Sequence, residues 1–325
     1  MNPQTIESPF LPVISPFDSE PGSAADPHDP LAELVAPASA SATPERPTTV
    51  RGALSDTNFL EYYGLTSNPF ADCVHPSFFF RTESHAEAFR SMMLAVDFHA
   101  SLGLVTGPSG SGKTLVSQLL LEHLDPVKYH VILVLVTPGL SKTGLLREIL
   151  SELNIGLPTG VNRVQDLFKL LSNQIIAMHE RGQRLVIVVD ECHLLAADCL
   201  HIVRTISNIE IPERKLTTSL LFGESRLAQR LEHSSYESLR NRIYLRAKLQ
   251  PLIVDETAQY VKFRLLVAGR MAELFTPDAL VALQAHSGGI CRTLNKLCML
   301  SLIEGCTRRQ SLVDGTVVAA CAARM

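Results

Sequence analysis

Short apolar runs alternate with amphipathic stretches over the middle of the chain, between residues 84 and 250. The apolar runs are too uniformly hydrophobic for half-exposed strands, so we expect buried strands near residues 102–106, 131–137, 185–190, 217–222 and 243–248. Apolar positions recur at helical spacing near residues 84–99, 112–124, 141–153, 163–181, 195–209 and 225–232. Strands separated by helices predict an α/β fold, a five-stranded parallel sheet with helices on both faces.

The pattern changes after Pro251, where only helical spacing continues. The expected helices lie near residues 254–268, 277–286, 290–304 and 312–323. The sequence therefore predicts an α/β domain large enough to bind a nucleotide over residues 56–250 and a small all-helical domain over residues 251–325.

The N-terminal segment has a different composition. Residues 1–50 hold ten of the 19 prolines, seven acidic residues and one basic residue, Arg46. Such a segment cannot bury a core, so residues 1–55 are expected to be a disordered, Pro-rich acidic segment. The other 275 residues carry 28 Lys and Arg against 26 Asp and Glu, a balance that neither demands nor excludes nucleic acid.

Cysteine usage and hydropathy indicate the compartment. The seven cysteines form no C-x-x-C pair and are odd in number, which argues against a zinc site or a disulfide framework. The longest apolar runs, such as residues 131–136 and 185–189, are far shorter than the ~20 residues of a membrane helix. The N-terminus also lacks a secretory signal. We expect a cytoplasmic protein without a membrane segment.

One octapeptide carries the first chemical signal. Its residues are Gly107, Pro108, Ser109, Gly110, Ser111, Gly112, Lys113 and Thr114, which spell G-x-x-x-x-G-K-T. It lies between an apolar strand and an apolar helix, so it predicts a phosphate-binding P-loop rather than a flexible Gly/Ser loop. Lys113 is expected to reach the β- and γ-phosphates of ATP, and Thr114 to bind Mg²⁺.

A second motif follows about eighty residues later, where an apolar strand ends in Asp190 and Glu191. Open α/β sheets place their ligands at the carboxyl ends of strands. We therefore interpret this pair as a Walker B element and not as a merely solvated strand end. Asp190 is expected to bind the Mg²⁺ through water, and Glu191 to orient and polarise the attacking water.

Further stretches extend the similarity to a known family. They are Tyr63 to Phe70, His75 to Phe80, Ser84 to Ala88, Asp190 to His193, Ile202 to Glu210 and Ser287 to Asn295. Together with the P-loop, they resemble the ExeA-like AAA+ ATPases of the general secretion pathway protein A type. That family is close to the ATPase regulators of transposition and to origin-recognition-type AAA domains. The resemblance covers residues 58–305 and implies a P-loop AAA+ sheet domain followed by a helical lid.

The resemblance also implies two arginine roles. Arg292 matches the lid's sensor-2 arginine, which contacts the γ-phosphate; a plain helix-surface arginine is the alternative, because Cys291 stands where the family has proline. Arg242 matches the arginine finger that one subunit inserts into its neighbour's site, with Arg240 as the second choice. A finger implies a homo-oligomer, either a ring or a filament.

Several residues near these motifs leave alternatives open. Glu224 stands at the sensor-1 position, where the family has a neutral amide, and puts sensor-1 function in doubt. Thr137 is either a switch residue for Glu191 or a plain strand-end threonine. Phe70 either stacks on the adenine or belongs to a packed N-terminal arm. His193 is expected at a helix start near the site, without a catalytic role.

The run Phe78 to Phe80 is expected to plug the core and not to stack on nucleic-acid bases.

The resemblance implies an ATPase that couples nucleotide state to lid and subunit movement. Its expected target is a protein partner in secretion or the envelope. The alternative is an ATP-dependent regulator that binds duplex DNA, as the transposition ATPases do. A third possibility is a nucleotide-stabilised scaffold that barely hydrolyses ATP, which the carboxylate of Glu224 favours.

Overall fold

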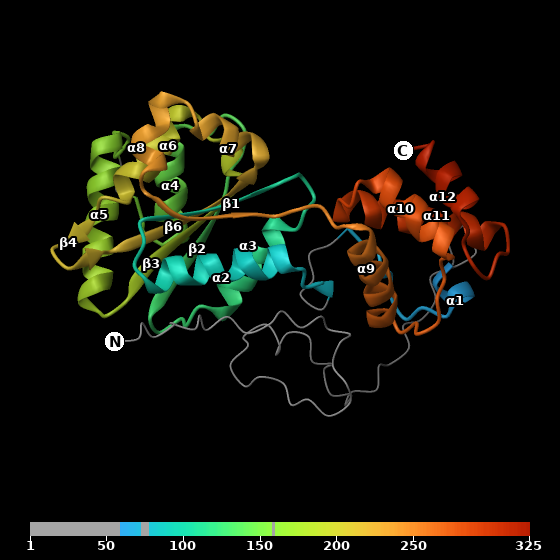
Figure 1. Cartoon of the computed structure of the whole chain (residues 1–325). Helices are drawn as coiled ribbons and strands as arrows, with labels where there is room; N and C mark the ends of the chain where they lie inside the picture. The colour runs from blue at the N-terminus through green and yellow to red at the C-terminus, as the bar shows by residue number, and fades with distance from the viewer. Residues whose placement is uncertain (1–58, 73–77, 158–159) are drawn as a thin grey trace, which may run out of the picture. The chain divides into compact units, whose positions relative to one another are not determined.

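The computed structural model of the chain describes residues 59–72, 78–157 and 160–325 (Figure 1). The predicted N-terminal segment 1–55 lies outside the described residues. The described part contains a five-stranded parallel sheet, and this confirms the predicted fold class. In sheet order the strands are β2 (Tyr129–Leu135), β3 (Arg184–Asp190), β6 (Thr217–Glu224), β1 (Leu102–Gly107) and β7 (Ile243–Lys248).

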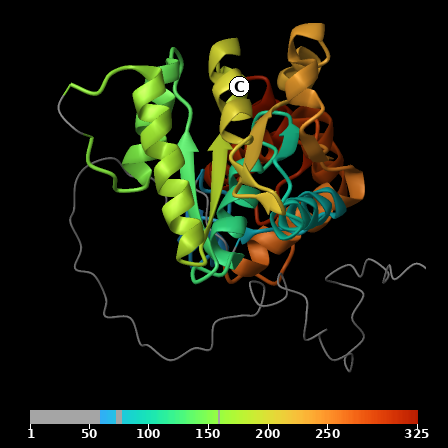
Figure 2. The same cartoon turned by 90° about the vertical axis from the view of Figure 1, so that its left-hand side faces the viewer.

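The middle of the sheet is buried on both faces, because side chains alternate between two apolar layers. All seven residues of β3 are buried. Leu185, Ile187 and Val189 point into one core with helices α4 to α7, while Met92 of α2 packs on Gly103 at the other face. Figures 1 and 2 show α2 and α3 on one side of the sheet and α4 to α7 on the other. These helices are α2 (Glu83–Asp97), α3 (Lys113–His123), α4 (Lys142–Glu152), α5 (Val164–Glu180), α6 (Ala197–Ile206) and α7 (Ser225–Leu231).

Strand register brings the chemical motifs to one edge of the sheet. Gly107 at the end of β1 pairs with Glu224 at the end of β6. Asp190 ends β3 beside Leu135 of β2. The P-loop, the Walker B carboxylates and the sensor-1 position therefore share the carboxyl edge of the sheet, where ligands of such folds bind.

The structure adds short elements that hydropathy did not predict. A two-stranded hairpin precedes the fourth long strand, and short helices occur at the start of the described chain and before β7. Their bounds are β4 (Glu210–Ile211), β5 (Arg214–Lys215), α1 (Phe59–Tyr63), η2 (Cys192–Leu194), η3 (Ser234–Tyr236) and α8 (Glu237–Arg240). The second strand begins at Tyr129 and ends at Leu135, so Thr137 lies beyond its end.

The C-terminal part is helical, as expected, apart from one β-bridge between Phe275 and Val313. Its helices are α9 (Val254–Val267), α10 (Pro277–Ser287), α11 (Cys291–Thr307) and α12 (Gly315–Ala322). They surround a second core that includes Leu265, Leu283 and Leu297. Tyr63 and Phe70, from the stretch before the sheet, are buried in this same core.

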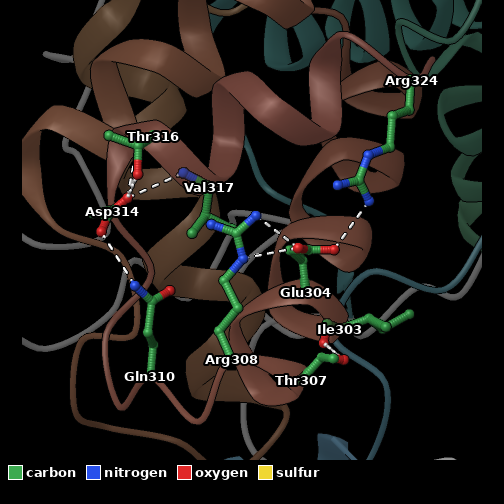
Figure 3. Close-up of polar contacts among 9 residues, drawn as sticks. All are labelled: Ile303, Glu304, Thr307, Arg308, Gln310, Asp314, Thr316, Val317 and Arg324. Carbon is green, nitrogen blue, oxygen red and sulfur yellow. Dashed lines mark hydrogen bonds and ion pairs between the residues drawn. The ribbon is translucent and has the colours of Figure 1, made fainter.

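Polar contacts join α11 to the end of α12 and cap the start of α12 (Figure 3). Glu304 on α11 accepts hydrogen bonds from Arg308, one turn later, and from Arg324 beyond α12. Asp314 caps α12, since its Oδ1 accepts from the backbone N–H groups of Thr316 at 2.9 Å and Val317 at 3.0 Å. The cap fixes the start of α12 after residue 314, two to three residues later than the apolar pattern predicts.

Candidate functional site

The P-loop connects the end of β1 to the start of α3. Gly110 and Gly112 have φ values of +75° and +94°, which only glycine adopts without strain. A Cβ on Gly112 would lie 2.8 Å from Nε2 of His85, so a side chain does not fit there either. The glycines that the sequence requires for curling the loop around an anion therefore have that conformation.

Lys113 is buried at the first turn of α3, with 4% of its surface exposed. Its Nζ donates to the carbonyl oxygens of Pro108 at 2.8 Å and Gly107 at 3.3 Å. Burial lowers the pKa of this ammonium, and the carboxylates of Glu191, Glu224 and Asp190 oppose that shift. The cation is thus held over its own loop, beside a cluster of anions.

The Walker A and Walker B motifs are joined by a direct hydrogen bond. Oγ1 of Thr114 donates to Oδ2 of Asp190 at 2.8 Å, and Oδ1 of Asp190 accepts from the backbone N–H of Glu191 at 2.8 Å. A hydroxyl and a carboxylate are the hard oxygen ligands that Mg²⁺ prefers. The two residues predicted to hold Mg²⁺ therefore fit this ion in both chemistry and placement.

Glu191 has a left-handed backbone, with φ +55°, and its side chain is 37% exposed. Its Oε2 lies 3.3 Å from Nδ1 of His193, in the 3₁₀ turn after the strand. Left-handed backbone is uncommon outside glycine and is found most often at functional positions. The left-handed backbone changes the direction of the chain at Glu191, directly after Asp190, the last residue of the buried strand β3.

His193 links Glu191 to the sensor-1 position. Nδ1 of His193 accepts from the backbone N–H of Glu224 at 3.3 Å, and its Nε2 lies 3.7 Å from Oε2 of Glu224. Burial lowers the pKa of His193, with Glu224 acting in the opposite direction. Arg226 lies 3.0 Å from the same carboxylate oxygen of Glu224.

Glu191, His193 and Glu224 each offer one ligand atom, and these atoms lie within 4.8 Å of one another. The set could hold a divalent ion, although Arg226 already forms an ion pair with Glu224. Sequence reasoning placed His193 near the site but did not find its contacts with the two carboxylates.

A cavity of about 230 Å³ adjoins the P-loop and extends to the C-terminal helices. Lys113, Thr114 and Glu191 line one end, and Phe78, Tyr260, Arg264 and Asn295 line the other. The guanidinium of Arg264 lies 4.4 Å from the centre of the Phe78 ring, and the hydroxyl of Tyr260 donates to Oδ1 of Asn295 at 2.8 Å. A flat aromatic and cationic end beside a phosphate loop suits a nucleoside base.

The aromatic residues before α2 divide between core and cavity. Phe79 and Phe80 are 2% and 6% exposed, which agrees with the predicted core plug, although all three of Phe78 to Phe80 also line the cavity. Phe70 is 1% exposed and packs edge-on against Phe275 at 6.4 Å. It is absent from the cavity wall, so the packed-arm alternative holds for Phe70.

Arg292 lies at the start of α11, against the P-loop. Its backbone N–H donates to the carbonyl of Gly110 at 3.2 Å, and its side chain lines the cavity, 64% exposed and 3.8 Å from Asp72. The sensor-2 role of Arg292 stays a prediction. Thr137 is exposed, and among the described contacts none joins it to Glu191.

Arg242 is not part of this cavity's lining. Its Nε and Nη2 donate to Oδ1 of Asn208 at 3.0 and 2.7 Å, and its Nη1 donates to the carbonyl of Ser238. Among the described residues no carboxylate pairs with it, whereas Arg240 lies 3.1 Å from Glu232. Arg242 is therefore a guanidinium positioned by neutral oxygen acceptors, whereas the second choice, Arg240, forms an ion pair with Glu232.

With this geometry in place, comparison with known proteins identifies the domain. Residues 96–231 match the family model described as AAA domain. This part of the chain is an AAA domain. General secretion pathway protein A of Aeromonas hydrophila is 33% identical over 260 residues, which are 80% of this chain and 47% of that protein. The chain thus spans about half the length of this curated relative, and the predicted resemblance is confirmed.

Solved structures show the same fold at lower identity. ORC2 of Aeropyrum pernix in its ADP form matches with a TM-score of 0.58 at 12% identity, over 78% of this chain and 71% of that one. Drosophila ORC bound to DNA matches with a TM-score of 0.61 at 14% identity, over 87% and 70%. The AAA domain thus has the AAA+ P-loop ATPase fold. In the part of the chain that the structure covers, none of the helices is both long and apolar enough to span a bilayer.

Proposed function

We propose that this AAA+ protein binds ATP with Mg²⁺ and hydrolyses it to ADP and phosphate. The observation that carries the proposal is the hydrogen bond from Thr114 to Asp190, which joins the two Walker motifs beside an exposed Glu191. ORC2 of Aeropyrum pernix, of the same fold, was solved with ADP.

The residues divide the work by their chemistry. The ammonium of Lys113 exchanges its loop carbonyls for the β- and γ-phosphates, and the amides of the P-loop cradle the anion. Glu191 accepts a hydrogen bond from the attacking water and polarises it toward the γ-phosphate. Thr114 and Asp190 hold Mg²⁺, which neutralises charge on the phosphate oxygens when bound.

Two arginines couple the bound nucleotide to the C-terminal helices and to a neighbouring subunit. Arg292 touches the P-loop through its backbone, so contact of its side chain with the γ-phosphate would move the C-terminal helices. Arg242 does not line its own subunit's cavity and has no carboxylate partner among the described residues, which suits insertion into the site of a neighbouring copy. We therefore propose a ring or filament of identical subunits.

The proposed target is a protein partner of the secretion or envelope machinery on the cytoplasmic side. Its support is the identity with General secretion pathway protein A over most of this chain. Duplex DNA is the second candidate, because structures of the same fold include Drosophila ORC bound to DNA and Aeropyrum pernix ORC1 in complex with DNA.

The test is the ATPase rate of the purified protein with and without duplex DNA, with Lys113→Ala as the inactive reference. The wild-type chain is expected to release phosphate and the variant not to. Stimulation by DNA that falls steeply with salt would favour the DNA-binding regulator. Equal rates with and without DNA favour the protein partner, and equal ATP affinity of wild type and Lys113→Ala would refute the P-loop assignment.

A further inference from the structure

His85, on the first turn of α2, is buried beside the P-loop with 4% of its surface exposed. Its Nε2 lies 2.9 Å from the carbonyl oxygen of Ser111, and its Nδ1 lies 2.6 Å from Oγ1 of Thr82. The ring of Phe79 packs edge-on against the imidazole, 5.9 Å between centres. None of the roles described above uses this histidine.

The partners fix the direction of each hydrogen bond. A carbonyl oxygen only accepts, so Nε2 of His85 carries the proton. Burial lowers the pKa of His85, which leaves the ring neutral and Nδ1 an acceptor for the hydroxyl of Thr82. Because that hydroxyl has one proton, the contact of 3.1 Å between Thr82 and Ser84 must be donated by Ser84. Oγ of Ser84 in turn accepts from the backbone N–H of Gln250 at 3.4 Å.

The result is one continuous chain of hydrogen bonds from Gln250 through Ser84, Thr82 and His85 to Ser111. Gln250 lies in the segment between β7 and α9, which leads into the C-terminal helices. The same segment is fixed at both ends, because Leu249 donates to Thr106 at 2.7 Å and Leu252 donates to Gly289 at 2.9 Å. These hydrogen bonds therefore join the phosphate loop to the segment that connects the sheet with the C-terminal helices.

The contact at Ser111 has a consequence for phosphate binding. A trans peptide is planar, so the carbonyl of Ser111 and the N–H of Gly112 point in opposite directions. Holding the carbonyl against His85 points the N–H of Gly112 away from α2. Without His85, this peptide, next to a glycine at φ +94°, is free to turn.

We propose that His85 is a positioning residue that holds the P-loop in its phosphate-binding form, and that Thr82 and Ser84 connect this loop to the segment entering the C-terminal helices. The inference rests on the proposed ATP binding at the P-loop. His85 also lines the cavity beside the P-loop, but no contact with the nucleotide is needed for this role. It acts through the peptide between Ser111 and Gly112.

Two amide substitutions separate positioning from packing. Glutamine places its amide N–H near the position of Nε2, so His85→Gln keeps a donor for Ser111. Asparagine is shorter and reaches only the position of Nδ1, so His85→Asn loses that donor. We expect His85→Asn to weaken binding of a fluorescent ATP analogue roughly tenfold, the effect of one lost buried hydrogen bond, and His85→Gln to restore most of it. KM should rise in His85→Asn while kcat stays within roughly twofold.

The control is thermal unfolding without nucleotide. If His85→Asn melts much lower than His85→Gln, Thr82→Val against Thr82→Ser repeats the test, because valine removes the hydroxyl that donates to Nδ1 and serine keeps it. Equal ATP affinity within both pairs would overturn the positioning role. A wild-type chain that binds no ATP would instead overturn the proposed function and the positioning role together.

The connection to Gln250 is tested by Ser84→Ala, with Ser84→Thr as the variant that keeps the hydroxyl. Hydrogen exchange at the amides of residues 249–253 is measured with and without ATP. In wild type and Ser84→Thr we expect ATP to slow exchange in this segment, and in Ser84→Ala the slowing should be lost. The same protection in Ser84→Ala would overturn the connection and leave only the role of His85 at the loop.

Discussion

Nε of Arg226 lies 3.0 Å from Oε2 of Glu224, the carboxylate at the sensor-1 position. The sequence shows an acid where the resembling family has an amide, and an acid so near the γ-phosphate would repel it. The structure shows that this acid is paired with a cation of its own helix start and lies beside His193. Its charge is therefore reduced, though Glu224 remains 28% exposed and keeps part of its repulsion.

Glu224→Gln should raise the rate of ATP hydrolysis, because the amide keeps the shape but removes the charge. We expect an increase of roughly threefold to tenfold, the effect of one partly screened charge near the reacting phosphate. Phosphate release at saturating ATP measures it. Arg226→Ala should slow the wild-type chain but change the Glu224→Gln chain little, and additive effects of the two substitutions would contradict the pairing.

Glu191→Gln tests the proposed base. The amide cannot polarise water as a carboxylate does, so we expect ATP to bind normally and hydrolysis to fall roughly a hundredfold or more. Paired measurements of ATP affinity and phosphate release separate the two effects. Glu152→Gln, an exposed glutamate at the end of α4, is the matched control and should turn over at the wild-type rate. Wild-type turnover in Glu191→Gln would assign the role to another residue.

The main features of the site followed from local sequence. The P-loop lies between a buried strand and a helix, and Asp190 and Glu191 come directly after the apolar run Leu185 to Val189. Parallel strands bring both motifs to one edge, so their meeting through Thr114 and Asp190 is predictable without knowledge of side-chain contacts. The helical C-terminal part is equally predictable, because apolar residues recur there only at helical spacing.

Other features depend on contacts between distant parts of the chain. Phe70 is as compatible with a base stack as with a core until Phe275, some two hundred residues later, is placed against it. The role of His85 depends on its contact with the backbone carbonyl of Ser111. Because every residue has such a carbonyl, the sequence does not show which one His85 contacts. The strands β4 and β5 have two residues each, too few to show an alternating pattern.

Stability should fall in mild acid, because His85 and His193, which are buried, and His99, which is half-buried, all have lowered pKa values. Burial is the largest cause for His85, His99 and His193. The unfolded chain binds protons below a histidine pKa of about 6.5, while these folded histidines stay neutral to lower pH. The free energy of unfolding should thus be constant above neutrality and decrease as pH falls below about 6.5. Each fully buried histidine contributes about 1 kcal/mol for the first pH unit.

Denaturant unfolding of wild type and His85→Gln between about pH 5.5 and 8 measures this dependence. The variant lacks one of the three histidines, so its stability should decrease less steeply in acid. Identical pH dependence in the two proteins would show that His85 titrates alike in the folded and unfolded chain.

The last prediction concerns assembly. If Arg242 completes the site of a neighbouring copy, activity per molecule should rise with protein concentration. Arg242→Ala should bind ATP normally and turn over roughly a thousandfold more slowly, the lower end of the effect of known arginine fingers. Arg240→Ala is the matched control, because Arg240 is already held in an ion pair with Glu232 of its own subunit, and we expect its turnover near the wild-type rate.

Mixing the variants decides whether the arginine acts between subunits. Arg242→Ala supplies an intact P-loop and Lys113→Ala supplies an intact Arg242, so a mixed assembly contains complete sites that neither pure protein forms. Phosphate release from the mixture should exceed the sum of the separate proteins and vanish when either is diluted below the assembly concentration. No rescue, together with a monomer in light scattering with bound ATP, would contradict the trans role. Arg242 would then serve only its own subunit, through the contacts with Asn208 and Ser238.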